Sequence, residues 1–203
     1  MSAPLEALRR RFGGHTPGLM GARHAFAVLC PLVERPGGPH LLFEVRAAEL
    51  RQGGEVCFPG GKLEPGETPE AGALRETEEE LAVPASEITL LGRTDFLCSQ
   101  RGFLLHPFLG LVSPAGMAAM RPSPAEVAEV FTVPLAFFQA TPPEVYAYDL
   151  VPQPPEGFPY EAVGVSPDYP WSRGRVEVPV WTWQNHAIWG MTGRIVREIL
   201  RGL

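Results

Sequence analysis

One short acidic segment, from Gly61 to Val83, constrains the fold of this chain more than any other feature. It reads GKLEPGETPEAGALRETEEELAV. Glu76, Glu79 and Glu80 are spaced i, i+3 and i+4, so a helix would place their carboxylates on one face. At about 100° per residue, the opposite face would carry Leu74, Thr77 and Leu81. The segment therefore predicts a helix with one face for a core and one face dense in negative charge.

Packing these carboxylates together has an electrostatic cost, because neighbouring like charges raise one another's pKa and oppose joint ionisation. A divalent cation that prefers hard oxygen ligands relieves that cost, and Mg²⁺ and Mn²⁺ are the usual choices. The spacing of Glu76, Glu79 and Glu80 therefore indicates a metal site with Mg²⁺ or Mn²⁺ as the cofactor. Taken alone, an acidic run is also compatible with a solvated helix face or a protein-interaction face.

The residues around the acidic run place it after a strand and a glycine loop. Val56-Cys57-Phe58 is a short apolar run, and Pro59-Gly60-Gly61 follows it directly. Thr68 is a good N-cap, Pro69 suits the first helical position, and Pro84 should end the helix. The predicted order is strand, glycine loop and acidic helix. In this order the loop can offer backbone groups to a ligand while the helix supplies the charge.

The whole segment resembles the Nudix box, the signature of a family of hydrolases. The positions in register with that pattern are Gly61, Glu67, Arg75, Glu76, Glu79, Glu80 and Val83. Two positions depart from it, because Thr77 replaces an aliphatic residue and Ala82 replaces the final glycine. Alanine adopts a left-handed conformation only with strain, so we expect the backbone at Ala82 to differ or the helix to close on Pro84.

The resemblance implies a role for each of these residues and a fold for the chain. The metal ligands, which would also serve catalysis, would be the backbone of Gly61 and the carboxylates of Glu76, Glu79 and Glu80. Glu67 and Arg75 would form an ion pair that braces the loop against the helix. Glu126 is a candidate general base from a loop opposite the box, with capping of a strand as its alternative role. The fold implied is an α/β/α sandwich with a mixed sheet.

Residues upstream of the box are similar to the additional signature of coenzyme A diphosphatases, a Nudix subfamily. The matching residues are Arg46, Leu50, Arg51, Gly54, Glu55, Val56, Phe58, Pro59, Gly60 and Gly61. Residues 126–135 and 189–198 resemble two later segments of those enzymes. The implied substrate site comprises Arg46, Arg51, Gly60 and Gly61, since a guanidinium group grips phosphate oxygens well. The alternative for both arginines is an ordinary place on the surface.

The implied activity is metal-dependent hydrolysis of coenzyme A, or a derivative, to 3′,5′-ADP and 4′-phosphopantetheine or its acyl form. One alternative is a Nudix pyrophosphatase that acts on ADP-ribose, a dinucleotide or a modified nucleotide. Another is a catalytically inactive Nudix-like binding module, although every box carboxylate is present in this chain. The expected partner is therefore a small nucleotide substrate of the coenzyme A class.

Apolar runs and turn signals predict the remaining elements of a single domain over residues 1–203. The expected strands are residues 25–32, 41–45, 88–91, 103–105, 108–112 and 127–133. The expected helices, apart from the acidic one, are residues 5–12, 135–139 and 183–200. Residues 141–179 are rich in proline, glycine and aromatic residues, so they should form a long irregular segment with short strands.

Charge and cysteine content exclude several classes of protein. A net charge of −6 argues against general nucleic-acid binding, which requires a basic surface. No apolar run is long enough for a membrane helix, and no secretory signal is visible. Cys30, Cys57 and Cys98 are widely spaced and each lies among apolar residues, which favours buried free thiols in a reducing compartment. We therefore expect a cytoplasmic enzyme that neither spans a membrane nor binds nucleic acid.

Overall fold

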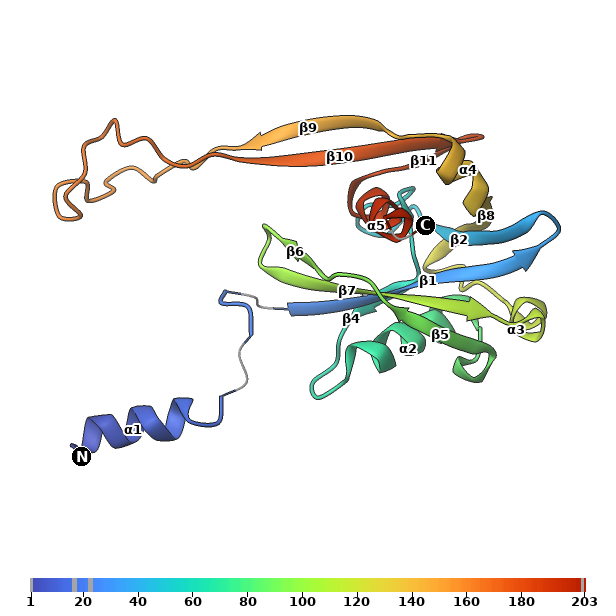
Figure 1. Cartoon of the computed structure of the whole chain (residues 1–203), viewed down its shortest axis with the longest axis horizontal. Helices are drawn as coiled ribbons and strands as arrows, with labels where there is room; N and C mark the ends of the chain where they lie inside the picture. Colours follow the sequence, from blue (N-terminus) through green and yellow to red (C-terminus); the bar gives the residue numbers. More distant parts are fainter. Residues whose placement is uncertain (1, 16–17, 22–23, 202) are drawn as a thin grey trace.

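The computed structural model describes residues 2–15, 18–21, 24–201 and 203. Helix α2 covers one face of a mixed sheet and helix α5 lies against the other, so the body has three layers (Figure 1). The helices are α1 (Ala3–Phe12), α2 (Pro69–Leu81), the 3₁₀ turn η1 (Ala85–Glu87), α3 (Pro114–Ala119), α4 (Leu135–Ala140) and α5 (Gly190–Leu200). This arrangement confirms the predicted α/β/α sandwich with a mixed sheet.

The described strands form two sheets, one of eight strands and one of three. The larger sheet contains β1 (His24–Arg35), β2 (Gly38–Arg46), β3 (Val56–Cys57), β4 (Gly60–Lys62), β5 (Ile88–Arg93), β6 (Leu97–Ser99), β7 (Phe103–Val112) and β8 (Val127–Pro134). The smaller sheet contains β9 (Glu144–Leu150), β10 (Gly174–Trp183) and β11 (His186–Ile188). Strands β1 and β7 pair in parallel, whereas the other pairs are antiparallel, which makes the larger sheet mixed.

Strands β1 and β2 separate along their length, and the glycine loop fills the gap between them. The two strands pair only from Leu32 opposite Leu41 to the turn. Beyond that point, β3 pairs with β2 at Glu44, and β4 pairs with β1 where Ala27 lies opposite Gly61. Residues 56–62 are therefore held in the middle of the sheet by both neighbours. This wedge is what brings a central strand, the glycine loop and helix α2 to one place.

Alternating side chains of β2 divide between the two faces of the sheet, as the geometry of a strand requires. Leu42 packs in a core under α2, where Ala27, Leu29, Ala73, Leu81 and Val127 are also buried. Leu41 and Phe43 pack in the opposite core, where Phe58, Val133, Trp181, Ile195 and Ile199 are buried. Each buried side chain of this size contributes roughly 1.5–3 kcal/mol to folding. Helices α2 and α5 are therefore both fixed by apolar packing against the same sheet.

The predicted strands 103–105 and 108–112 are one continuous strand, β7, so the expected break between them was wrong. Proline lacks a backbone N–H, and this suggested that Pro107 ends a strand. In the structure, β6 pairs with β7 up to Leu105 and β5 pairs from Phe108. The position of Pro107 therefore falls between these two partners, where a missing donor costs little.

Residues 141–179 are more regular than the sequence predicted. Strands β9 and β10 pair without a register shift from Glu144 opposite Val180 to Leu150 opposite Gly174. They form a long ribbon that projects beyond the body, and only residues 151–173 at its tip are irregular (Figure 1). The predicted helix over 183–200 was also too long. Strands β10 and β11 turn at Gln184, whose φ is 54°, and the helix begins at Gly190.

The expectation of three buried thiols holds only for Cys30. Its side chain is fully buried in the core. Cys57 is half-buried and Cys98 is exposed. Cys98 belongs to β6, a three-residue strand paired with β7, so its apolar neighbours in sequence do not cover it.

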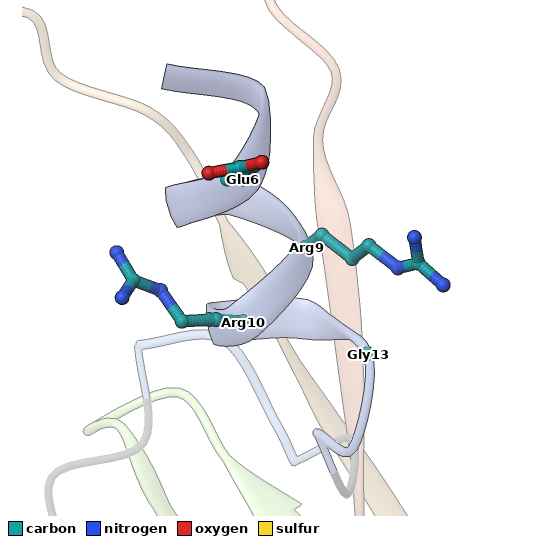
Figure 2. Close-up of a pocket in the computed structure, with 4 residues that line it drawn as sticks. All are labelled: Glu6, Arg9, Arg10 and Gly13. Atoms are coloured by element: carbon teal, nitrogen blue, oxygen red, sulfur yellow. The ribbon is translucent and has the colours of Figure 1, made fainter. Parts of the chain in front are cut away.

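Helix α1 stands away from the sheet (Figure 1). The structure describes all of its residues and buries none of them, so the helix predicted over residues 5–12 is present and is exposed to solvent. Figure 2 shows Arg9 and Arg10 pointing in different directions beside a hollow that Glu6 and Gly13 also line. Among the described residues, those that line the hollow belong to this exposed helix and its end. None of them belongs to the acidic helix α2.

Candidate active site

Helix α2 begins at the residues that its sequence favours, but it ends at Leu81, three residues before the predicted stop at Pro84. The Thr68 side chain accepts a hydrogen bond from the Ala71 backbone N–H at 3.2 Å, and Pro69 is the first helical residue. At the other end, Ala82 takes the left-handed conformation, with φ 53° and ψ 32°. Its N–H donates to the Glu78 carbonyl at 2.9 Å. The expectation of an altered backbone was wrong, because alanine here accepts the strain that glycine would avoid.

Thr77 fills the position that is aliphatic in the Nudix box. Its side chain is fully buried, and its hydroxyl donates a hydrogen bond to the Ala73 carbonyl at 2.7 Å. A buried hydroxyl is costly only when it lacks a partner. The substitution therefore changes the local packing without leaving an unsatisfied polar group.

The glycine loop is packed so closely between β1 and α2 that neither Gly60 nor Gly61 leaves room for a side chain. A Cβ on Gly60 would lie 2.3 Å from the Ala27 carbonyl oxygen. A Cβ on Gly61 would lie 2.4 Å from the carboxyl carbon of Glu76. The Gly60 N–H donates to Glu80 Oε2 at 2.7 Å, so it is engaged by the helix and does not point freely towards a ligand.

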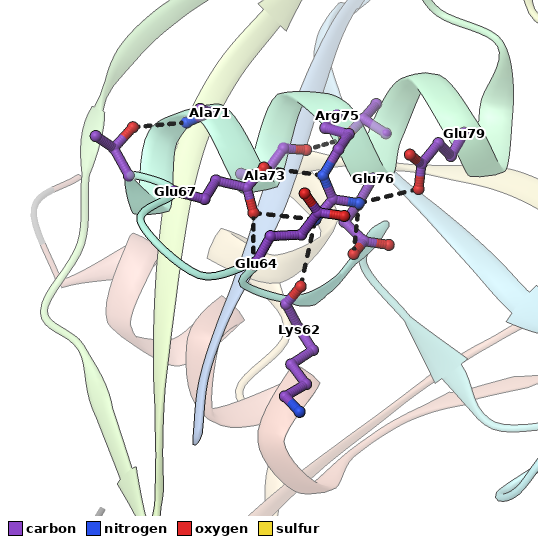
Figure 3. A network of polar contacts seen from close by, with 10 residues as sticks. Lys62, Glu64, Glu67, Ala71, Ala73, Arg75, Glu76 and Glu79 are labelled. Carbon is purple, nitrogen blue, oxygen red and sulfur yellow. Dashed lines mark hydrogen bonds and ion pairs between the residues drawn. The ribbon is translucent and has the colours of Figure 1, made fainter. Parts of the chain in front are cut away.

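Arg75 ties the loop to the helix through several carboxylates (Figure 3). Its Nε donates to Glu67 Oε1 at 2.8 Å and its Nη2 donates to Glu67 Oε2 at 3.1 Å, which is a bidentate contact. Its Nη1 lies 2.9 Å from Glu76 and 3.0 Å from Glu79. The Nη2 group also reaches the Lys62 carbonyl at 3.3 Å. This is the ion pair between Glu67 and Arg75 that the resemblance implied, extended to two further acids.

The network fixes the ionisation of Glu67. The Arg75 hydrogen bonds, followed by a hydrogen bond from the Glu64 N–H, lower the pKa of Glu67 to about 2. The same contacts raise the pKa of Arg75 above its ordinary value. Both groups are therefore charged at neutral pH, and the pair is a permanent feature of the loop.

The box carboxylates do not all point the same way. Glu80 is buried, with 5% of its surface exposed, and Glu76 is largely covered. The Glu79 side chain is 56% exposed and is turned towards Arg75. The predicted acidic face thus divides into an inner part against the glycine loop and an outer part on the surface.

Burial and the charges of neighbouring acids raise the pKa of the inner carboxylates, Glu76 and Glu80. Burial, followed by the charge of Glu44, raises the pKa of Glu80. Burial is also the first cause of the raised pKa of Glu76. The charge of Glu126 is the last of the causes that raise the pKa of Glu44, Glu76 and Glu80. Glu126 is exposed, and its loop is tied to β2 and α2, because the Ala47 N–H donates to the Glu126 carbonyl at 2.8 Å and the Ser123 N–H donates to the Glu80 carbonyl at 2.7 Å.

The two predicted substrate arginines are linked to each other at the end of β2. Arg46 lies two residues after Glu44, and its charge lowers the pKa of Glu44. Its Nε donates to the Arg51 carbonyl at 3.4 Å. Arg51 is exposed in the loop between β2 and β3, and only its backbone takes part in this contact.

Glu44 is the site residue that sequence reasoning missed. It is the charged member of the apolar run Leu41-Leu42-Phe43-Glu44-Val45, and its side chain is 1% exposed. Cys57 donates a thiol hydrogen bond to its Oε1 at 3.2 Å. A charged residue is rarely buried without a partner, so a lone acid in a predicted central strand was the available signal.

The donor set of the inner site fits a hard divalent cation. Glu80 is buried, Glu76 is largely covered, and Glu44 Oε2 is buried without a hydrogen-bond partner in the described part of the chain. Mg²⁺ and Mn²⁺ prefer oxygen ligands of this kind. As the side chains stand, no group of three or more acidic, histidine or cysteine residues within the described ranges is already gathered for a metal.

Comparison with known proteins places the chain in a family. Residues 23–151 match the model of the NUDIX domain. The chain is 36% identical to the Nudix hydrolase NudL of Photorhabdus laumondii, covering 87% of this chain and 83% of that protein. It is 31% identical to the human mitochondrial coenzyme A diphosphatase NUDT8, covering 95% of this chain and 75% of that protein. It is 39% identical to the mouse peroxisomal coenzyme A diphosphatase NUDT7, covering 60% of this chain and 50% of that protein.

A solved structure supports the fold alone. The MutT/nudix family protein of Enterococcus faecalis is similar over 98% of this chain and 69% of its own, with a TM-score of 0.51 and 14% identity. In the described ranges, none of the helices has the length and apolar character needed to cross a membrane. Nudix hydrolases generally use divalent metal ions, which agrees with the chemistry of the inner site. Domain match and relatives together show that the chain belongs to the Nudix family and is a pyrophosphohydrolase.

Proposed function

We propose that this enzyme hydrolyses the diphosphate of coenzyme A or a derivative to 3′,5′-ADP and 4′-phosphopantetheine or its acyl form. The observation that carries the proposal is the similarity to NUDT8 along 95% of this chain, because that protein is named a coenzyme A diphosphatase. The residues shared with the subfamily signature also support the proposal. They run from Arg46 to Gly61, through the wedge whose Cys57 and Gly60 contact Glu44 and Glu80.

Mg²⁺ or Mn²⁺ is the proposed cofactor, with Glu76, Glu79, Glu80 and the backbone of Gly61 as its ligands. Bound there, the cation would neutralise the charge of the diphosphate and lower the pKa of a water molecule. The Glu79 side chain is 56% exposed whereas that of Glu76 is 17% exposed, so the part of Glu79 in this site is the outermost of the three box carboxylates.

The side chains of this enzyme would supply binding and proton transfer. Arg46 and Arg51 would hold phosphate oxygens through their guanidinium groups. The water oxygen would bond to one phosphorus, the bridging P–O bond would break, and the other phosphate would leave with the bridging oxygen. Glu126 is the proposed general base that takes the proton from the water, since backbone hydrogen bonds tie its loop to both α2 and β2.

The test is incubation of the purified protein with coenzyme A and Mg²⁺ or Mn²⁺, followed by separation of the products. We expect 3′,5′-ADP and 4′-phosphopantetheine, and we expect Glu80→Gln to cut turnover by orders of magnitude while the circular dichroism spectrum is unchanged. ADP-ribose, dinucleotides and modified nucleotides belong in the same panel. Intact coenzyme A beside efficient turnover of one of these compounds would overturn the proposal.

The predicted cytoplasmic location stays a prediction, since NUDT8 and NUDT7 are named mitochondrial and peroxisomal.

A further inference from the structure

Glu44 lies at a point of β2 where the fold would otherwise be expected to place an apolar side chain. It belongs to the same face of the strand as Leu42, which packs fully buried under α2. The Glu44 side chain is 1% exposed. Its position is created by the separation of β1 and β2, because Glu44 pairs with Cys57 of the wedge rather than with β1. Glu44 is therefore surrounded by residues of the wedge and the core, and not by solvent.

One oxygen of Glu44 is satisfied and the other is not. Oε1 accepts the Cys57 thiol hydrogen bond at 3.2 Å. Oε2 is buried and lacks a hydrogen-bond partner among the residues that the structure describes. An unpaired buried polar group costs about 1–3 kcal/mol, and a charged group costs more. A purely structural role does not account for this, because an apolar residue of similar size would avoid the cost.

The neighbours of Glu44 are the acids that a cation would bridge. Glu44 and Glu80 both contact the wedge, since Cys57 donates to Glu44 Oε1 at 3.2 Å and the Gly60 N–H donates to Glu80 Oε2 at 2.7 Å. Arg46 lies two residues further along β2. Buried carboxylates gathered at one segment are stable together when a proton or a cation is shared between them.

We propose that Glu44 is an inner acidic residue of the cation site, which adds a carboxylate oxygen to those of the box glutamates. Cys57 holds one Glu44 oxygen and leaves the other available for the ion. The inference rests on the proposed metal-dependent function and extends its ligand set to a residue on the central sheet, outside the box. It predicts a cation site anchored on both α2 and β2.

The test measures binding of Mg²⁺ and of Mn²⁺ alone, by isothermal titration calorimetry at one fixed pH. We expect Glu44→Gln to weaken binding at least tenfold relative to the wild type. Glu78→Gln is the matched control, because it removes one charge from an exposed position of α2 and should bind as the wild type does. Thermal melting in EDTA checks the fold. Glu44→Gln should melt no lower than the wild type, since it removes a buried charge.

The outcomes separate this inference from the proposed function. If the wild type binds neither metal, the metal-dependent function itself is wrong. If the wild type binds and Glu80→Gln does not, but Glu44→Gln binds as tightly as the wild type, only the role of Glu44 is overturned. If Glu44→Gln fails to fold, Glu44→Asp takes its place, because it keeps the charge but withdraws the carboxylate by one methylene. Unchanged affinity in a folded Glu44→Asp variant would likewise overturn the role.

Discussion

At the scale of single residues, Ala82 departs from the family pattern at a position with a left-handed backbone, which strains most residue types other than glycine. Ala82 ends α2 in the left-handed region, which usually favours glycine. The hydrogen bond from its N–H to the Glu78 carbonyl is formed all the same. The helix end is therefore set by the packing of Leu81 and Val83 on either side, both of which are buried.

We predict that Ala82→Gly raises the free energy of unfolding by about 0.5–1 kcal/mol, since relief of left-handed strain outweighs the extra chain entropy of glycine. Urea denaturation with a two-state fit measures this change. The control is Ala71→Gly, at an exposed helical position of α2, which should lower stability by a similar amount. Equal stability of Ala82→Gly and the wild type would contradict the prediction.

At the scale of elements, Arg75 joins α2 to the turn that connects β4 to the helix. Glu67 lies in that turn, and Arg75 extends from the helix to donate two hydrogen bonds to its carboxylate. The Lys62 carbonyl of β4 accepts from the same guanidinium, so the network reaches into the sheet. The ion pair thus holds the helix against the wedge that contains Gly60 and Gly61.

This pairing predicts how stability depends on acid. The pKa of Glu67 is about 2 in the folded protein, below its ordinary value of 4.5. Its contribution to stability is therefore fully present above about pH 4.5 and is lost as pH falls through about 2. We expect Glu67→Gln to show a shallower loss of stability between these pH values, measured by urea denaturation. Glu70→Gln, an exposed acid in the first turn of α2, should keep the wild-type slope. Parallel slopes for Glu67→Gln and the wild type would refute the assignment.

At the scale of the whole molecule, the three-layer body and the projecting ribbon are built differently. The base of β10 is anchored, because Trp181 is buried and its Nε1 donates to the Thr141 carbonyl at 2.8 Å. Further out, residues 144–149 of β9 are all exposed. The tip has its own aromatic contacts, such as Phe158 with Trp171 at 5.5 Å between ring centroids. The tip therefore packs mainly on itself.

We predict that the body folds without the tip. Replacing residues 151–173 by Asn-Gly would join Leu150 to Gly174, which already lie opposite each other, through a favoured two-residue turn. Thermal melting should remain cooperative, with a Tm lowered by no more than about 3 °C. Ile195→Ala truncates a buried side chain on α5 and should lower the free energy of unfolding by about 2–5 kcal/mol. Its Tm in the same assay shows how large the effect of a core substitution is. Loss of cooperative melting in the shortened chain would show that the tip supports the body.

The sequence by itself determined helix α2, its N-cap and the box register, because these depend on residues only a few positions apart. Thr68 and Pro69 start the helix locally, and the spacing of Glu76 and Glu80 fixes the face that they share. The tertiary structure alone decided that Glu44 is buried at the wedge, where Cys57 donates a hydrogen bond to its Oε1. That outcome depends on the gap between β1 and β2, which is set by contacts between segments far apart in the chain. Local periodicity carries no information about such contacts, and this is also why the paired ribbon of β9 and β10 went unpredicted.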